Sequence, residues 1–366
     1  MARLTRVQQQ ERTRAAVLTA AEAEFGEHGY LDAKIDRIAD RADLTRGAVY
    51  SNFPSKRALY LAVLADLIGR TAGDGQASVP RSVADALDDL ARVWLERFPL
   101  LDDRPAHRDL RLRSLTGVVD DEPARTTLAQ VGRLEALLLA LALERIQPPA
   151  RRRVRLAELA LTLLHGATHL AETAPGLGDP FDLTLAARHL ASLDLRDSWE
   201  PAHLPHVPPA ESGQASWLPP AGLTDLLTGE PVDLGADGVV AVLGVHRLAA
   251  VEEAIRAASP GEPVTVAVVT GDPAELGYLV RVRVGDLMDR LRQVFPPDAW
   301  LPLRLVLDDR AVLASAIGLD QAEDATEAAV RLRDGMIVAR AHGRGAGHAA
   351  GAAVEAVRRR GDGERG

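Results

Sequence analysis

Residues 35–56, IDRIADRADLTRGAVYSNFPSK, decide how the N-terminal part of this 366-residue chain folds. Apolar residues recur there at helical spacing on both sides of a three-residue turn, residues 42–44. These apolar positions are Ile35, Ile38, Ala39, Ala42, Leu44 and Val49. Two short helices joined by such a turn form a helix-turn-helix, whose second helix enters the major groove of DNA. The stretch therefore predicts a DNA-binding unit.

Helical patterns continue on both sides of this unit, up to about residue 200. Asp32 and Thr45 are predicted as N-caps of the second and third helices, because their side-chain oxygens can accept from free backbone N–H groups. Ser55 precedes the fourth helix. The predicted helices cover residues 8–28, 34–41, 46–53, 56–69, 82–98, 104–118, 122–146, 150–173 and 181–194.

The chain changes character at residues 201–220, which contain six prolines. Proline removes a backbone donor and fixes φ, so this density predicts a linker or an extended strap. Short β-rich segments then alternate with helical ones, which favours a mainly parallel α/β domain. The predicted strands are 239–245, 264–270, 303–307, 328–332 and 337–341, and the predicted helices are 246–258, 273–295, 311–318 and 346–360.

These patterns predict a multidomain protein, all-α in its first part and α/β in its second. The length agrees, since about 150 residues per domain suggests two or three domains. The predicted parts are a helix-turn-helix domain at 1–54, a helical domain at 55–200, a proline-rich linker at 201–221, an α/β domain at 222–358 and a tail at 359–366.

The composition excludes several kinds of chemistry. The chain has no cysteine, so disulfides, thiolate metal sites, thiol nucleophiles and dithiol redox reactions are excluded. The net charge is −9, but the first 72 residues hold 11 basic and 9 acidic side chains, so a small positive excess coincides with the DNA-binding unit. No apolar run approaches the roughly 18 residues of a membrane span, and the charged N-terminus lacks a signal-peptide pattern. We therefore expect a cytoplasmic protein with no membrane partner.

Several residues between positions 10 and 70 agree in both type and spacing with a known family. They are Phe25, Gly29, Tyr30, Ile38, Ala39, Gly47, Tyr50, Phe53, Lys56 and Leu59. In these residues the segment resembles the DNA-binding domain of the tetracycline-repressor (TetR) family. The resemblance implies a regulator, usually a repressor, that binds a palindromic operator as a homodimer and is released by a small-molecule effector. It also implies that residues 73–200 hold the effector pocket and that their last two helices form the dimer interface.

The residues expected to contact double-stranded DNA lie on and around the second helix of the unit. Hydroxyl and ammonium donors suit phosphate oxygens, while the donors of Arg46 and Asn52 suit the edges of guanine and adenine. The family usually has hydroxyl residues where Ala33 and Lys34 stand, so Lys34 is expected to replace a hydroxyl contact with a charge. The full set is Lys34, Arg37, Thr45, Arg46, Gly47, Ala48, Tyr50, Ser51, Asn52 and Lys56.

The predicted effector pocket combines aromatic, cationic and imidazole side chains, which suits an apolar ligand with one polar group. Its candidates are Trp94, Phe98, Arg111 and His165. His165 and His169 have a spacing that can bind zinc, but no further ligand stands at a clear spacing nearby, so interface or pocket histidines are favoured. The dimer-interface candidates are Leu156, Leu159, Leu163, Gly166, Ala167 and Leu170 in one helix, and Leu185, His189 and Leu193 in the next.

The order of elements after residue 222 resembles a thioredoxin-like or peroxiredoxin-like domain. The segments that carry this resemblance are 303–309, 316–319 and 330–340. Asp334 and Gly335 are predicted at the turn of a hairpin. Where the family has its reactive cysteine this chain has VHRL at 245–248, and where the family has a cis-proline it has EDAT at 323–326, so no redox activity is expected. We expect the domain to make dimer or protein-partner contacts; a generic α/β ligand domain is the alternative.

Two further motifs are weak. Residues 345–351, GAGHAAG, loosely match a dinucleotide-binding loop, but the chain ends about 15 residues later, without room for a second strand. Binding of a phosphate group by the N-terminus of this helix is kept as an alternative. Asp308 and Asp309 could form a metal site, but a turn at the end of a strand is the favoured interpretation of this pair.

Two other functions compete with a regulator. A fusion of regulator and enzyme would give the α/β domain a non-thiol activity, and would require His246, Asp272 and Asp308 to converge. A scaffold protein with an inactive DNA-binding unit is disfavoured by the presence of Thr45, Tyr50 and Lys56. We expect no catalytic residues, no metal and no cofactor.

Overall fold

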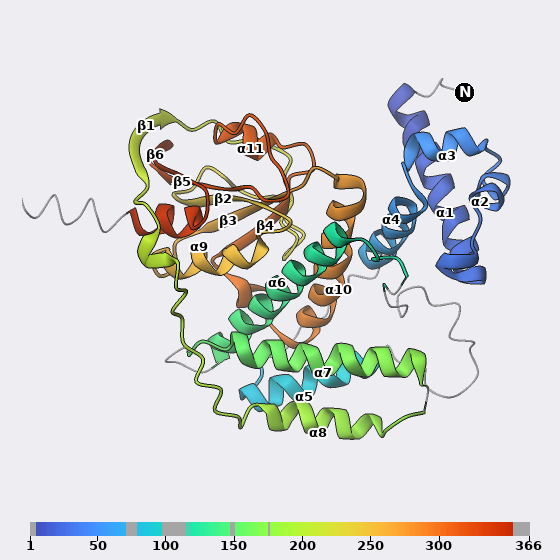
Figure 1. Ribbon diagram of the computed structural model, residues 1–366, viewed down its shortest axis with the longest axis horizontal. Helices are drawn as coiled ribbons and strands as arrows, with labels where there is room; N and C mark the ends of the chain where they lie inside the picture. The colour runs from blue at the N-terminus through green and yellow to red at the C-terminus, as the bar shows by residue number, and fades with distance from the viewer. Residues whose placement is uncertain are drawn as a thin grey trace, which may run out of the picture.

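The structure is a computed structural model that describes residues 5–70, 79–96, 115, 117–146, 151–174 and 176–353. Four N-terminal helices form a lobe at one side of the molecule (Figure 1). This N-terminal lobe consists of α1 (Arg6–Asp32), α2 (Ile35–Arg41), α3 (Arg46–Asn52) and α4 (Lys56–Gly69). The four helices agree with the sequence pattern, and Gly29, at φ +74°, kinks α1 near its end.

The caps of the N-terminal lobe agree with the prediction at Thr45 and differ at Asp32. The Thr45 hydroxyl oxygen accepts from the backbone N–H of Ala48, as expected for the N-cap of α3. Asp32 is itself the last residue of α1, and the N-cap position of α2 is Lys34, which has no capping side chain. The Glu24 carboxylate accepts from the Lys34 backbone N–H at 3.0 Å. A side chain of α1 thus binds a backbone donor at the start of α2, the role that was predicted for Asp32.

A second group of helices, the helical body, follows the N-terminal lobe. It consists of α5 (Val83–Leu95), α6 (Glu122–Ile146), α7 (Val154–Thr173) and α8 (Pro180–Leu190). Most of the helix predicted at 104–118 lies outside the described residues. Within the described part of the chain, α6 is the one helix long and apolar enough to cross a membrane, but more than half of its apolar window is buried inside the protein. It is the central core helix of this group.

The remaining chain forms a six-stranded mixed sheet with the order β1-β6-β5-β2-β3-β4. Its strands are β1 (Glu211–Ser216), β2 (Gly238–Gly244), β3 (Val264–Val269), β4 (Leu303–Leu307), β5 (Glu327–Arg333) and β6 (Met336–His342). The prediction of a mainly parallel sheet was wrong in part, because only β2, β3 and β4 run parallel and the other three pairings are antiparallel. The predicted linker 201–221 is not free either, since β1 lies within it and pairs with β6.

Helices α9 (Val251–Ala257), α10 (Tyr278–Val294) and α11 (Val312–Ala316) connect the strands, and a last helix starts at residue 346. A five-residue π-helix, Pro273–Gly277, leads into α10 and is called the π-turn below. The hairpin between β5 and β6 turns at Asp334 and Gly335, which both have positive φ, as predicted for this pair of residues.

The core of the sheet joins the core of the helical body. One hydrophobic cluster runs from the N-terminal lobe through α5, α6, α7 and α10 to one face of the sheet, where Val239, Val266 and Leu305 belong to it. The opposite face of the sheet packs on a smaller cluster that includes Trp217 and α11. Helix α10 belongs to the α/β segment by sequence, yet it packs against α4, α5 and α6 (Figure 1). The segments predicted as separate domains, 55–200 and 222–358, therefore share one core.

Candidate nucleic-acid interface

Helix α3 presents its polar side to solvent and buries Val49 against the lobe. Arg46, Gly47, Tyr50 and Ser51 are exposed on its outer surface. The Arg46 guanidinium lies 5.5 Å from the centre of the Tyr50 ring and 3.5 Å from Asp36. A short helix that offers a guanidinium, two hydroxyls and an open backbone at glycine has the donors that a DNA major groove accepts.

A buried carboxylate holds α2 against α1 and so fixes where α3 points. Glu24 is 0% exposed, and its Oε1 accepts from Arg37 Nε at 2.5 Å in addition to the Lys34 backbone. Arg41 donates to Glu27 at 3.0 and 2.5 Å. Three long-range contacts from α1 thus replace the local cap that α2 lacks.

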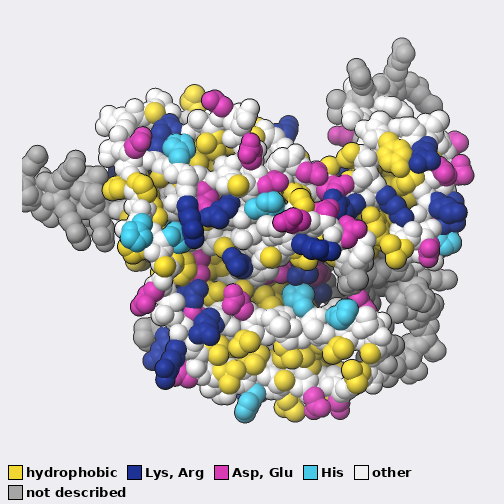
Figure 2. Space-filling view, in the orientation of Figure 1, with side chains coloured by type: hydrophobic (Ala, Val, Ile, Leu, Met, Phe, Trp, Pro, Cys, Tyr) yellow, Lys and Arg dark blue, Asp and Glu magenta, His cyan; other side chains and the backbone are white. Residues whose placement is uncertain are grey.

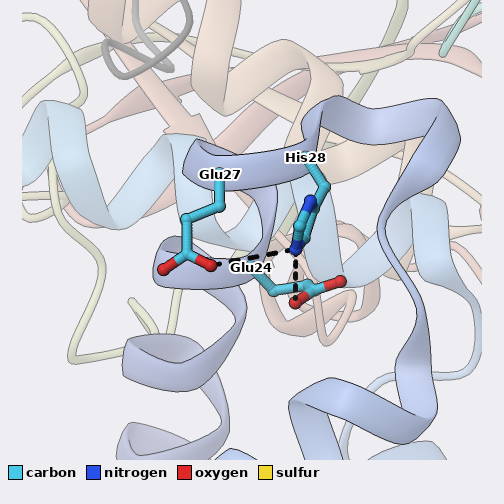
Figure 3. Close-up of side chains that lie close together, drawn as sticks. All are labelled: Glu24, Glu27 and His28. Carbon is cyan, nitrogen blue, oxygen red and sulfur yellow. Dashed lines mark ion pairs between the residues drawn. The ribbon is translucent and has the colours of Figure 1, made fainter.

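Glu24, Glu27 and His28 point toward one another from α1 (Figure 3). His28 Nε2 lies 3.7 Å from Glu24 and 3.8 Å from Glu27, and within the described ranges this is the one group of three acid or histidine ligands compact enough to hold a metal ion. Two guanidinium groups, of Arg37 and Arg41, already neutralise these carboxylates. We assign the cluster a structural role.

The structure places the predicted DNA-contact residues in two groups. Those on the outer side of α3, together with Thr45 and Lys34, are exposed. Others turn toward the protein: Arg37 is bound to Glu24 and to the Asp32 carbonyl, and Lys56 Nζ donates to the Leu31 carbonyl at 3.0 Å. Burial lowers the pKa of Lys56, whose ammonium also lies 5.0 Å from the centre of the Tyr30 ring.

The side chains at the end of α3 fold back onto its backbone. Ser51 Oγ and Asn52 Nδ2 both donate to the Ala48 carbonyl, at 2.8 and 2.9 Å. Asn52 would have to release this bond before it could read an adenine edge, so Arg46 is the better placed of the two predicted base contacts. The individual DNA contacts remain predictions.

Contacts between the N-terminal lobe and the α/β segment escaped the sequence analysis. Ser55 and Arg57, at the start of α4, both donate to the carboxylate of Glu275 in the π-turn, and Arg57 also donates to Asp121. Arg14 of α1 donates to the Tyr278 hydroxyl at 2.5 Å. The contacts to Glu275 and Tyr278 each span more than 200 positions of the sequence and the contact to Asp121 spans 64, and no periodicity in the sequence signals such pairs.

Two of the predicted effector-pocket residues do lie together, in the helical body. Trp94 is 2% exposed and donates to Thr168 Oγ1 at 2.8 Å, and its indole meets the His165 ring edge-on at 5.1 Å. Phe98 and Arg111 lie outside the described residues.

Side chains of α10 fill the space beside this pair. Arg283 donates to Glu135 at 2.9 and 2.6 Å and to His165 Nε2 at 2.7 Å. The Arg290 guanidinium lies 4.1 Å from the centre of the Trp94 indole. The space beside Trp94 and His165 is therefore filled by arginine side chains of α10.

His165 is held in its neutral form by this arrangement. Burial, followed by the nearby Arg283 charge, lowers the pKa of His165. The geometry then assigns the proton to Nδ1, which donates to the Leu161 carbonyl at 2.8 Å, while Nε2 accepts from Arg283. His169, one turn later, is exposed and forms no compact metal group among the described residues.

We expect His165 to make the protein less stable in mild acid. The unfolded chain binds a proton near pH 6.5 while folded His165 stays neutral, so the free energy of unfolding falls as pH drops below about 6.5, until folded His165 protonates as well. Urea unfolding of wild type and His165→Gln at several pH values between 7.5 and 5 measures this. The variant should lose less stability than wild type over that range, and His169→Gln should behave like wild type. Equal pH profiles for all three proteins would contradict the prediction.

The acidic and histidine residues at the ends of the parallel strands serve local structure. Asp308 accepts from the backbone N–H groups of residues 312–314 at 2.7–3.0 Å, so it caps α11 at a strand-end turn, as predicted. Asp272 accepts from the Glu275 N–H at 3.0 Å, and burial raises the pKa of Asp272. His246 Nε2 lies 3.2 Å from the Pro123 carbonyl oxygen.

The start of the last helix is occupied as well. The Gly345 backbone N–H donates to the Glu327 carboxylate at 2.8 Å. A Cβ at Gly345 would come within 2.3 Å of the Val207 side chain, so the strap covers this turn. The Glu327 carboxylate thus occupies the helix start at which the sequence analysis had kept a bound phosphate as an alternative.

The N-terminal lobe has the geometry of a helix-turn-helix unit: α2, which buries Ile35, Ile38 and Ala39, a short turn, and α3 with its polar side exposed. Residues 17–63 match the family described as bacterial regulatory proteins, tetR family. This part of the chain is a TetR-family N-terminal domain.

A curated relative is also a helix-turn-helix regulator. The chain is 36% identical over 100 residues to the HTH-type transcriptional repressor SCO4008 of Streptomyces coelicolor, a match that covers 27% of this chain and 46% of that protein. The chain thus matches about half the length of this curated relative.

Two solved structures are similar to about half of the chain. One is the transcriptional regulator FadR from Bacillus subtilis in complex with stearoyl-CoA, with 19% identity, a TM-score of 0.34, and coverage of 49% of this chain and 97% of that chain. The other is the putative transcriptional regulator SCO4942 from Streptomyces coelicolor, with 26% identity, a TM-score of 0.31, and the same coverage of 49% and 97%.

Proposed function

We propose that the protein is a sequence-specific DNA-binding transcription regulator, acting as a homodimeric repressor on a palindromic operator. The observation that carries the proposal is the exposed polar side of α3 within a segment that matches the tetR family. A dimer with two-fold symmetry places two such helices in successive major grooves. The α/β segment has no proposed catalytic role, and the proposal gives it dimer or partner contacts.

An exposed apolar surface on α7 and α8 supports the homodimer. Figure 2 shows hydrophobic side chains gathered along these helices, and this α7/α8 face includes Leu159, Leu170, Phe181, Leu185 and Leu193, each 41–72% exposed. A Cβ at Gly166 would meet nothing within 4 Å, so a partner helix can approach there. Leu156, predicted for the same surface, is 4% exposed and packs in the protein's own core instead. An apolar surface of this kind is typical of an interface.

A small-molecule effector is the proposed signal that releases DNA. The FadR structure, which is similar to about half of this chain, is a complex with stearoyl-CoA. In this chain the arginines of α10 lie beside Trp94 and His165. An effector entering there would have to displace α10, and that displacement is the movement we propose for release.

We expect Arg46→Ala to weaken operator binding about tenfold, because it removes a guanidinium that can bond a base edge or a phosphate. The measurement is fluorescence anisotropy with DNA from upstream of the protein's own gene, at two salt concentrations, since affinity should also fall steeply with salt. Arg92→Ala is the matched control, because it removes an exposed arginine on α5, outside the N-terminal lobe. No specific binding site upstream of the gene or its neighbours would overturn the proposed function.

A further inference from the structure

The α/β segment contacts the N-terminal lobe on both sides of the end of α3. On one side, Arg14 donates to the Tyr278 hydroxyl at 2.5 Å and to the Asn52 carbonyl at 3.4 Å. Asn52 is the last residue of α3. Arg14 therefore joins the carboxyl end of the DNA-reading helix to the first residue of α10.

On the other side, Glu275 binds the residues that follow α3. Its two carboxylate oxygens accept from Ser55, the N-cap of α4, and from Arg57 in the first turn of that helix. The Arg57 and Glu275 side chains are 20% and 14% exposed, so solvent screens this pair little. Asp272 in turn accepts from the Glu275 backbone N–H and fixes the π-turn. The segment 52–57 is thus held at both ends, at Asn52 by Arg14, which is bound to Tyr278, and at its other end by Glu275, three positions before Tyr278.

Close packing reinforces these polar contacts. Helix α10 lies along α4. A Cβ placed at Gly285 would lie 3.2 Å from Ile68 Cγ2, so the two helices approach at a position where a larger side chain would push them apart. Because α4 and α10 are densely packed against each other, a displacement of α10 moves α4 with it.

Helix α10 connects this contact with the centre of the helical body. Its first turn carries Tyr278, while Arg283 and Arg290, one to three turns later, bind Glu135, His165 and Trp94. A helix of this length is a rod of about 25 Å. Any movement of the helical body against α10 therefore reaches the segment that follows α3.

We infer that Glu275 and α10 are positioning elements for DNA recognition: the α/β segment sets the orientation of the N-terminal lobe and thereby the spacing of the two α3 helices in the dimer. The inference rests on the proposed function and gives the appended segment a role in it. Fixing the lobe before DNA arrives lowers the ordering cost of binding. Glu275 acts through Ser55 and Arg57, without contacting DNA itself.

The experiment measures the position of the lobe directly, in the full-length protein. The chain has no cysteine, so Asp40→Cys and Asp320→Cys supply the only two labelling sites, both at exposed positions. Spin labels on these residues report the distribution of distances between the N-terminal lobe and the α/β segment. Dilution with unlabelled protein restricts the signal to single chains, and operator affinity is measured by anisotropy in parallel.

Glu275→Gln should broaden the distance distribution and weaken operator binding about fivefold. Tyr278→Phe, which removes the hydroxyl that accepts from Arg14, should act in the same direction and keeps the test valid if the first variant folds poorly. Asp298→Asn is the matched control, because it removes another arginine–carboxylate pair made by the α/β segment, Arg145 to Asp298 at 3.4 Å, which lies beyond the carboxyl end of α10, at the opposite end from Tyr278. It should leave both measurements as in wild type.

Unchanged distance distributions and affinities within twofold for both Glu275→Gln and Tyr278→Phe would overturn the inference. Stronger operator binding by these variants would overturn it too, since it would mean that the contact holds the lobe away from DNA. If wild type binds no operator, the proposed function fails, but the distance measurement still decides whether Glu275 positions the lobe.

Discussion

Replacing Arg283 by leucine should lower the free energy of unfolding by about 3–5 kcal/mol, which is a large part of the stability of a typical domain. Glu135 is 3% exposed and receives two hydrogen bonds from Arg283, at 2.9 and 2.6 Å. Without Arg283 its charge stays buried with no partner, and His165 Nε2 loses its donor as well. Urea unfolding monitored by circular dichroism measures the loss.

The double variant Glu135→Leu/Arg283→Leu separates the two contributions. Removing both charges leaves no orphaned carboxylate, so most of the lost stability should return. Arg281→Leu is the control on the same helix: Arg281 is 40% exposed and pairs with Asp309, and exposed pairs contribute about 0–1 kcal/mol. A loss below about 1 kcal/mol for Arg283→Leu would show that α10 does not depend on this contact.

The order of the elements could be predicted because it rests on local patterns. The helices of the N-terminal lobe, the Thr45 cap and the Asp334–Gly335 turn each follow from residues a few positions apart. Strand β1 escaped prediction because ESGQAS is polar and stands between prolines. An edge strand with one pairing partner needs no apolar face, so its sequence lacks the apolar alternation by which a strand is predicted.

The direction of the strands and the joining of the domains could not be predicted in the same way. Apolar runs such as β3 and β5 indicate buried strands without indicating their partners. Helix α10 was correctly expected within 273–295, but nothing local shows that its arginines enter the helical body.

In the candidate site, too, the sequence did not show which partner each single side chain contacts. Sequence reasoning proposed Arg37, Asn52 and Lys56 as DNA contacts from their donor chemistry. Each of these donors is bound to an acceptor of the protein: Glu24, the Ala48 carbonyl or the Leu31 carbonyl. Residue type shows what a group can bind, while the tertiary fold decides which acceptor it meets first.

Leu185→Glu should convert the proposed homodimer into a monomer and weaken operator binding by at least about 100-fold. Leu185 is 62% exposed in the middle of the α7/α8 face, beside Phe181. A glutamate there would be buried without a partner in the dimer, which costs several kcal/mol at each of two symmetric positions. The effect on DNA is larger than that of losing one side-chain contact, because linked half-site binding gains a factor of about 10²–10⁴ from effective concentration.

Analytical ultracentrifugation and anisotropy on the same samples connect the two effects. Leu218→Glu is the matched control, since Leu218 is 82% exposed and follows β1, which lies on the sheet and apart from α7 and α8 (Figure 1). It should remain dimeric and bind operator as wild type does. Dissociation by Leu218→Glu with an intact Leu185→Glu dimer would move the interface to the sheet. The helical body would then be left without a self-association role, and the spacing of the two α3 helices would have to be set through the α/β segment alone.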